Sequence, residues 1–442
     1  MTRRILFAIV LVAFALRVGW VAYAGVQPHF VGDPEAYLLQ GETFARGEGY
    51  VNPLVDIANV THRAKHEPLE SASPASFYPP GYPAFVGAVV WVVWHTPIPD
   101  DGLVRAVGYL QALLGAISVL FAFEIARKAF DSRVALIAAA IVALYPNLIM
   151  TTATLQLETV FVFLVLATVL VLMPVATHDH PSVPRLLVGG AMTGAVALVR
   201  PTIGLVIVAL VATLAIARAP ARDVMRSVGI ILLAMTALLA PWTIRNEIRL
   251  HAFVPISTGI GITVCVSRND EATGALDTGI MERHCQPHHS YASPAAREVA
   301  TNTYATRRAF DWVVAHPQRE LRMWFTRTSL AFRTDHSGLG DIRSSMSSRW
   351  ASAIAWVSDA ASYAVLGFAA IGGLVVARRR MRGGAFIVAT ALALATVPII
   401  LYGDPRYRVP TEPFFAILAA AGLATATRRA FRLRPARVAQ GR

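Results

Sequence analysis

Ten apolar stretches long enough to cross a lipid bilayer divide this chain of 442 residues. A membrane-spanning helix needs roughly 20 predominantly apolar residues. The chain is 55% hydrophobic and only 15% charged, whereas a soluble domain carries about 25% charged residues. The pattern predicts an all-α integral membrane protein with about ten transmembrane helices, near residues 5–26, 104–127, 134–150, 157–174, 186–199, 202–218, 227–243, 351–377, 385–402 and 409–427.

One further apolar run, residues 82–95, is too short for a full crossing and fits a re-entrant or interfacial helix. The distribution of arginines favours this choice. If 82–95 does not cross and the N-terminus lies inside, nearly all short basic clusters face the cytoplasm, as the positive-inside rule requires. Both termini then lie inside, and two long loops, 27–81 and about 244–350, lie outside.

These features divide the chain into three expected parts. Residues 1–243 form an N-terminal transmembrane catalytic module that includes the first external loop. Residues 244–350 form a second external loop with surface helices, and residues 351–442 supply the last membrane helices and a basic tail. The expected location is the cell (inner) membrane, with any active site on the external side.

The net charge of +13 does not indicate a nucleic-acid partner, because the basic residues are mostly arginines at the ends of spans. We expect the lipid bilayer to surround most of the chain. The sequence contains no Walker loop, dinucleotide glycine motif or nucleophile elbow, so it gives no support to a soluble nucleotide-dependent mechanism.

Two segments of the external loops have helical patterns. Residues 34–46 predict a short helix with Asp33 as its N-cap, whose apolar face we expect on the membrane surface. That face contains Tyr37, Leu38, Gly41, Phe44 and Ala45. Residues 297–332 predict one or two surface helices with four interface anchors, Trp312, Val313, Trp324 and Phe325.

Three acidic residues near the outer membrane surface are candidates for acid–base chemistry. Asp33 follows the first span closely, where a carboxylate can accept a proton from a substrate hydroxyl. The alternative is that Asp33 only caps the following helix. Glu35 and Glu158 are the other outer acids, and Glu158 has the alternative of a solvated carboxylate at a helix start.

Arginines at outer span ends break the positive-inside trend. The guanidinium fork matches a phosphate group, so several arginines around one outer cavity would suit a lipid-linked phosphate. The alternative for each is snorkelling to the interface. Arg17 lies near the middle of the first span, where a charge is costly and usually paired, so it is a functional-site candidate. The alternative is a structural pair with an acid on a neighbouring helix. The four outer arginines are Arg200, Arg245, Arg406 and Arg408.

Cys265 and Cys285 both lie in the second external loop, where two thiols favour a disulfide. The neighbouring histidines, His284, His288 and His289, invite a zinc interpretation. Their spacing matches no standard closed zinc site, so no metal site is predicted.

Four groups of motifs resemble, in order, the GT-C-fold glycosyltransferases of the protein O-mannosyltransferase and lipid A aminoarabinose-transferase superfamily. The resemblance covers nearly the whole chain. They are Gly32-Asp33-Pro34-Glu35-Ala36-Tyr37 with Ala45-Arg46-Gly47-Glu48-Gly49-Tyr50 and Tyr78-Pro79-Pro80-Gly81-Tyr82-Pro83; Leu198-Val199-Arg200-Pro201-Thr202; Pro241-Trp242-Thr243-Ile244-Arg245-Asn246 with Phe253-Val254-Pro255-Ile256-Ser257-Thr258-Gly259; and Tyr402-Gly403-Asp404-Pro405-Arg406-Tyr407-Arg408-Val409-Pro410.

The resemblance implies a membrane glycosyltransferase that uses a polyprenyl-phosphate sugar and a glycan, lipid or protein acceptor. It implies Asp33 as the catalytic acid–base residue and places Glu158 where a second outer acid is often found. The tyrosines of the first-loop motifs, Tyr37, Tyr78 and Tyr82, are expected in the substrate loop. No cofactor is required if arginines neutralise the phosphate, although a divalent metal held by Asp33 and Glu158 stays open.

Two other classes of protein stay open at this stage. A polytopic transporter or lipid flippase of the cell envelope is the main alternative, but such proteins tend to show inverted repeats and helices broken at the midplane. A non-catalytic assembly protein with the same fold is the other, because a fold alone does not establish an activity.

Overall fold

The computed structural model describes residues 1–25, 32–51, 73–98, 102–177, 181–288, 291–340 and 346–432, with the backbone alone for 428–432. These residues are helical and contain no strand beyond one isolated bridge between Val51 and Pro74. The predicted all-α membrane class is therefore confirmed.

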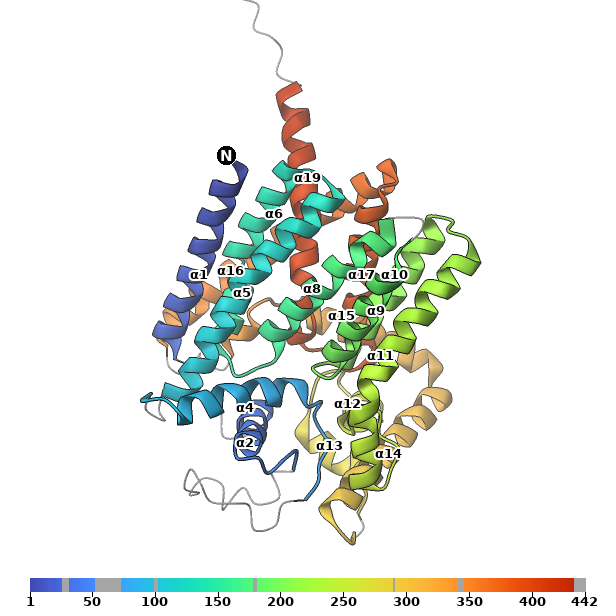
Figure 1. Ribbon diagram of the computed structural model, residues 1–442. Coiled ribbons are helices and arrows are strands. Elements are labelled where there is room, and N and C mark those ends of the chain that lie inside the picture. The colour runs from blue at the N-terminus through green and yellow to red at the C-terminus, as the bar shows by residue number, and fades with distance from the viewer. Residues whose placement is uncertain are drawn as a thin grey trace, which may run out of the picture.

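A bundle of long apolar helices forms one layer of the molecule (Figure 1). Small residues let two of its helices touch: a Cβ at Gly372 would lie 1.9 Å from the carbonyl oxygen of Leu418. The bundle contains α1 (Thr2–Ala24), α5 (Leu103–Ala129), α6 (Ser132–Leu144), α7 (Pro146–Met150), α8 (Glu158–Thr177), α9 (Val183–Ala197), α10 (Gly204–Ile216), α11 (Ala221–Leu250), α16 (Ser348–Arg379), α17 (Arg382–Ala395), α18 (Val397–Ile400) and α19 (Glu412–Arg432).

The predicted number of ten spans is not confirmed. Among the described residues, seven helices are long and apolar enough to cross a membrane. An eighth span results if α6 and the following segment to Ala153 are counted together, with a bend of 57° between them. The predicted spans 186–199 and 202–218 correspond to α9 and α10, which are only 15 and 13 residues long.

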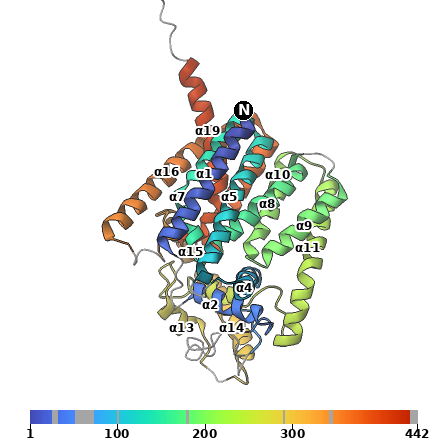
Figure 2. The ribbon, with the colours of Figure 1, turned by 60° about the vertical axis from the view of Figure 1, so that its left-hand side comes forward.

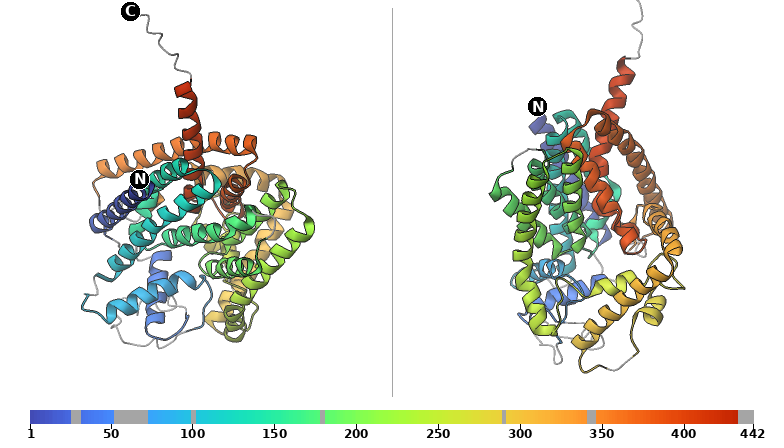
Figure 3. Two further views of the ribbon diagram at one scale, coloured as in Figure 1. Left: turned by 45° about the horizontal axis from the view of Figure 1, so that its top comes forward. Right: turned by 90° about the vertical axis from the view of Figure 1, so that its right-hand side faces the viewer.

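A second layer covers the end of the bundle opposite to the chain termini (Figures 1 and 3). The short apolar helix α4 lies across this end rather than along the bundle, in agreement with the interfacial interpretation of 82–95 (Figures 1 and 2). The layer contains α2 (Asp33–Ala45), α4 (Gly81–Trp94), α12 (Gly259–Cys265), α13 (Thr278–Cys285), α14 (Pro294–Ala315) and α15 (Pro317–Phe332).

The predicted orientation of α2 is wrong. Its apolar face packs on α4 instead of lying on the membrane surface, and Tyr37 is only 3% exposed. Two glycines allow the close approach, because a Cβ at Gly41 would lie 2.7 Å from Val86 Cγ1 and one at Gly87 would lie 2.8 Å from the Gly41 carbonyl oxygen. The contact fixes α2, and hence Asp33 at its start, against α4.

The surface-helix prediction for 297–332 is confirmed as two helices, α14 and α15. The interface anchors are only partly supported. Trp324 and Phe325 are exposed, but Trp312 is buried and its Nε1 donates to Asp270 at 3.0 Å. Trp312 is therefore a packing residue, because its side chain is buried whereas that of Trp324 is 42% exposed.

Helix α11 runs seven residues beyond the predicted end of its span at residue 243, to Leu250. It passes through the expected boundary between residues 243 and 244 and carries Arg245 into the second layer. Arg17 has no acidic partner among the described residues, so the alternative of a structural ion pair is not supported. Its guanidinium donates to the carbonyls of Ala13, Val142 and Ala143 at 3.1–3.2 Å, where α6 ends.

Candidate active site

Asp33 is the first residue of α2, and Gly32, not Asp33, occupies the N-cap position. The Asp33 side chain makes no capping hydrogen bond. Instead, its carboxylate accepts hydrogen bonds from the Tyr78 hydroxyl and from Nη1 of Arg406, both at 2.7 Å. The capping prediction is therefore wrong. Gly32, with φ 114°, occupies the N-cap position, so the Asp33 carboxylate is available to contact Tyr78 and Arg406.

The charge state of Asp33 follows from these neighbours. Burial alone would raise the pKa of the Asp33 carboxyl. The Arg406 guanidinium and the Tyr78 hydroxyl outweigh burial and lower that pKa below its ordinary value. Asp33 is therefore a carboxylate at neutral pH, and its side chain remains 30% exposed.

Arg406 joins two acids that are far apart in the sequence. Its Nη1 lies 2.7 Å from Asp33 Oδ2, and its Nε lies 3.0 Å from Glu158 Oε1. Glu158 begins α8 and is 2% exposed. Its Oε1 also accepts from Nη2 of Arg200 at 3.1 Å, and the Arg200 guanidinium lies 5.2 Å from the ring centre of Tyr407. We call these four charged side chains, Asp33, Arg406, Glu158 and Arg200, the charge chain.

The three predicted tyrosines form one aromatic group with different roles. The ring of Tyr37 lies 4.9 Å from both Tyr78 and Tyr82, edge to face. Only the Tyr78 hydroxyl reaches Asp33. Tyr82 is fully buried and donates to Gln111 at 3.1 Å, so it supports the site from behind and does not line it.

Arg245 does not lie with the charge chain. Its Nη1 donates to the Ala75 carbonyl at 2.7 Å and its Nη2 donates to the Tyr50 carbonyl. Its guanidinium also stacks 4.9 Å from the Trp242 ring centre. Arg245 therefore attaches the first loop to α11, because the backbone carbonyls of Tyr50 and Ala75 accept its hydrogen bonds.

Arg408 is also elsewhere. It is 1% exposed and forms an ion pair with Asp335 at 2.5 Å. The prediction that four arginines line one cavity is thus wrong, since only Arg200 and Arg406 converge. Glu35 is separate too: it is 8% exposed, no ion pair or hydrogen bond joins it to another described residue, and burial raises its pKa.

A cavity of about 340 Å³ opens beside the charge chain. The sequence prediction named only Glu158 and Arg406 among its lining residues. Asp404 belongs to the fourth motif of the sequence resemblance and could have been named as a site residue. The segment around His336 contains no motif that predicts a site. The cavity is lined by Thr151, Thr154, Gln156, Glu158, Thr334, His336, Ser337, Gly338, Leu339, Gly340, Asp404, Pro405 and Arg406.

Two of the lining groups that sequence reasoning missed are ionisable. The Asp404 carboxylate accepts from the backbone N–H of Arg406 at 2.9 Å, which helps to shape the turn that presents this arginine. Burial raises the pKa of the Asp404 carboxyl. His336 lies 3.1 Å from Asp359, measured from Nδ1 to Oδ1.

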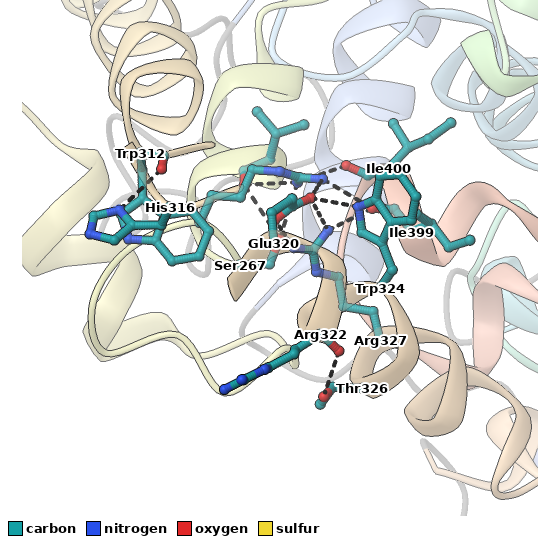
Figure 4. A network of polar contacts seen from close by, with 12 residues as sticks. Ser267, Trp312, His316, Glu320, Arg322, Trp324, Thr326, Arg327, Ile399 and Ile400 are labelled. Atoms are coloured by element: carbon teal, nitrogen blue, oxygen red, sulfur yellow. Dashed lines mark hydrogen bonds and ion pairs between the residues drawn. The ribbon is translucent and has the colours of Figure 1, made fainter. Parts of the chain in front are cut away.

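A polar network fixes the chain just before the Arg406 turn (Figure 4). Glu320 of α15 accepts hydrogen bonds from Arg268 Nη2 at 2.9 Å and from Arg327 Nη1 at 3.0 Å. Both arginines also donate to the carbonyl of Ile399, at 3.0 and 2.6 Å. They thereby satisfy carbonyls at the end of α18, which would otherwise lack partners. The turn that carries Arg406 begins a few residues later.

Cys265 and Cys285 form a disulfide that joins α12 and α13, with their Cα atoms 5.8 Å apart. The bond uses the thiol that the zinc interpretation needed. No group of three metal-binding side chains occurs within the described ranges of the chain.

The known proteins that resemble this chain share its architecture. Residues 91–244 match the family described as dolichyl-phosphate-mannose-protein mannosyltransferase. This segment contains Glu158 and Arg200 but not Asp33 or Arg406. No curated protein matches the chain.

Solved structures match over a longer range. The oligosaccharyltransferase AglB of Archaeoglobus fulgidus in the apo form is 14% identical, with a TM-score of 0.54, and the match covers 98% of this chain and 51% of that one. The same enzyme in complex with an inhibitory peptide and a dolichol-phosphate also gives 0.54 at 14% identity, over 98% and 51% of the chains. ArnT of Cupriavidus metallidurans bound to undecaprenyl phosphate is 15% identical over 96% and 78% of the chains, with a TM-score of 0.41.

The architecture is therefore the GT-C fold of membrane glycosyltransferases, as the sequence resemblance predicted. Within that class, the matched segment resembles the protein mannosyltransferases. The chain spans about half the length of the oligosaccharyltransferase that it matches.

Proposed function

We propose that this protein is a membrane glycosyltransferase that transfers a sugar from a polyprenyl-phosphate donor to an acceptor hydroxyl. The observation that carries the proposal is the charge chain, in which a partly exposed carboxylate and two guanidinia meet at the end of a membrane bundle. A carboxylate suits an acceptor hydroxyl, and guanidinia suit a phosphate. The fold and the matched family support the same class of reaction.

The chemistry follows from the roles of these groups. Asp33 removes the proton of the acceptor hydroxyl, and the resulting oxygen attacks the anomeric carbon. The bond between that carbon and the phosphate oxygen breaks on the opposite side, so the sugar configuration inverts. Polyprenyl phosphate leaves with the electron pair of that bond, and Arg406 and Arg200 stabilise its charge.

The position of Arg406 bears on whether Asp33 and Glu158 can share a metal ion. Its guanidinium contacts both Asp33 and Glu158, so it occupies the position between the two carboxylates. A divalent cation shared by these carboxylates would have to displace it, so the residues do not fit a metal in this arrangement. We therefore assign the neutralising charge to Arg406 and route no step through a metal.

The location of the site supports action on the external side of the cell membrane. The charge chain lies at the starts of α2 and α8, where the second layer meets the bundle, and the start of α1 and the end of α19 lie at the other end of the bundle (Figure 1). The positive-inside distribution assigns the terminal end to the cytoplasm. A transporter or flippase would instead place its binding site near the midplane.

Transfer by the purified protein in vesicles tests this proposal. We expect a polyprenyl-phosphate sugar to be converted to polyprenyl phosphate while the sugar appears on an added acceptor with inverted configuration. Mass spectrometry follows the lipid, and NMR of the product gives the configuration. Movement of intact donor between leaflets with no cleavage would instead identify a flippase.

A further inference from the structure

The chain that leads into Glu158 is not a continuous helix. The short helix η3 (Thr151–Ala153) ends at Thr154, and residues 154–157 form no regular helix before α8 begins at Glu158. Where the hydrogen bonds of a helix are interrupted, buried backbone carbonyls require donors from elsewhere in the fold. The position of Glu158 therefore depends on the side chains that supply those donors.

Gln111 of α5 supplies two of these donors. Its Nε2 donates to the carbonyl of Thr154 at 2.8 Å and to the carbonyl of Thr152 at 3.1 Å. Its Oε1 accepts a hydrogen bond from the Tyr82 hydroxyl of α4 at 3.1 Å. The side chain is 0% exposed, so these contacts are made in the protein interior. Gln111 therefore joins α4 to the chain before Glu158.

Helix α4 is also the support of Asp33. Helix α2, which begins at Asp33, packs on α4 through the close approach of Gly41 and Gly87. In addition, the Tyr82 ring of α4 contacts the Tyr37 ring of α2, edge to face, with the ring centres 4.9 Å apart. A shift of α4 relative to α5 would therefore carry Asp33 with it.

Arg406 requires the two acids at fixed positions. Its guanidinium contacts Asp33 at 2.7 Å through Nη1 and Glu158 at 3.0 Å through Nε. Both contacts form only while the two carboxylates keep the separation that a single guanidinium spans. The hydrogen bonds of Gln111 reach the supports of both acids, on the side of the site away from Arg406.

We propose that Gln111 is a positioning residue of the active site, which sets the separation of Asp33 and Glu158 that Arg406 spans. The kinetic consequences of this inference rest on the proposed function. Gln111 acts through α4 and through the chain before α8. Its loss should misplace the base relative to the acceptor hydroxyl and leave the binding of the donor lipid nearly unchanged.

Gln111→Met tests the inference, because methionine has a similar volume and no amide. The hydrogen bond from the Gly81 N–H to the Leu198 carbonyl, at 2.7 Å, still holds the start of α4. We expect kcat to fall at least about tenfold, with a donor KM within about threefold of wild type, since a misplacement of about 1 Å costs up to about a hundredfold in rate. An unchanged kcat in folded Gln111→Met would overturn the inference.

Ser118→Ala is the matched control. Ser118 is a buried polar residue of the same helix, and its hydroxyl donates to the Leu114 carbonyl of that helix at 2.9 Å. This bond reaches neither α4 nor the chain before Glu158. We therefore expect Ser118→Ala to leave kcat and the donor KM unchanged.

Tyr82→Phe removes only the link to α4 and keeps the two bonds from Gln111 to carbonyls. We expect kcat to fall about fivefold, as for the loss of one hydrogen bond. The double variant should have the kcat of Gln111→Met, because the Tyr82 hydroxyl acts through Gln111. Multiplied losses in the double variant would show separate roles and overturn the inference. If Gln111→Met does not fold, an unchanged kcat in Tyr82→Phe overturns it instead.

A cryo-EM structure of Gln111→Met separates the inference from the proposed function. We expect Arg406 to keep its contact with only one of the two carboxylates. An unchanged charge chain would overturn the inference even if the rate falls. If the wild-type protein transfers no sugar, the proposed function fails, and the structure of the variant still decides whether Gln111 positions the two acids.

Discussion

Arg406 and Arg408 stand two residues apart in one motif, yet the structure places them in two different environments. Arg406 is 19% exposed and contacts Asp33 and Glu158 beside the cavity. Arg408 is 1% exposed and contacts Asp335, which is 0% exposed. The same residue type therefore lies beside the candidate site in one case and in the protein interior in the other.

The Arg408 environment is a closed network of polar groups. Asp335 accepts from the Tyr145 hydroxyl at 2.5 Å and from Asn147 Nδ2 at 2.8 Å. Asn147 also donates to Glu412 at 3.0 Å. These residues join α7, the segment after α15 and the start of α19. Because Arg408, Asp335 and Glu412 are at most 1% exposed, a phosphate has no access to them, and their role is to hold three segments together.

The Arg406 environment differs because it is open. Asp33 remains 30% exposed, and Glu158 and Arg406 line a cavity. Incomplete hydrogen bonding does not separate the two environments, because buried atoms without hydrogen-bond partners among the described residues occur in both. Access to the side chains, rather than the number of arginines, distinguishes the candidate site from the structural one.

The largest expected effect concerns the closed network. Arg408→Leu should prevent accumulation of folded protein or lower its stability by about 3–5 kcal/mol, because Asp335 would stay buried without its partner. Thermal unfolding and size-exclusion chromatography of the detergent-purified variant measure this. A stable Arg408→Leu protein with a specific defect in donor binding would reverse the assignment of the two arginines.

Arg406→Lys should separate the two environments. We expect the variant to fold and unfold like the wild type but to lose transfer by about a hundredfold, because an ammonium cannot replace the guanidinium fork at a charge that develops in the transition state. Initial transfer rates at saturating donor give the value. The interpretation is contradicted if transfer is retained and stability collapses.

The pH dependence gives a smaller effect. Because the pKa of Asp33 is lowered, Asp33 is deprotonated at neutral and mildly acidic pH, and transfer should decline only as the pH falls below about 3.9, the ordinary aspartate value. Tyr78→Phe removes one group that lowers this pKa, so the acidic limb should move to higher pH. The lost hydrogen bond should also reduce the rate about fivefold, equivalent to about 1 kcal/mol.

A pH–rate profile of wild type and Tyr78→Phe checks both statements, with thermal unfolding at each pH as the control. An acidic limb near pH 6 in the wild type would show that another group titrates. An unchanged limb in Tyr78→Phe would remove the Tyr78 hydroxyl from the environment of Asp33.

The fold was largely predictable because span length and arginine placement depend on local composition. Span length predicted a re-entrant or interfacial helix at 82–95, and the shared external loop predicted the disulfide between Cys265 and Cys285. The count of ten spans was less predictable, because α9 and α10 are short and α6 ends at a bend. Helix length in a packed bundle depends on neighbours that no single segment encodes.

The site was predictable only in part. Motifs singled out Asp33, Arg200 and Arg406, a place at the outer start of a span singled out Glu158, and the structure brings these four together. Motifs did not separate Arg406 from Arg408, because burial is a property of the whole fold. The His336 segment carries no motif, and its place beside the cavity arises from contacts between α7 and the segment after α15.

The central claim is that Asp33 acts as the general base, and the transfer rate of Asp33→Asn tests it most directly. Since Gly32 caps the helix, this change removes the charge without removing a cap. Asp311→Asn, whose wild-type side chain is 66% exposed on α14, is the control. We predict normal folding, retained donor binding and a loss of transfer of about a hundredfold or more, because general-base catalysis contributes roughly that much. A well-folded Asp33→Asn protein that transfers sugar at close to the wild-type rate would contradict the account.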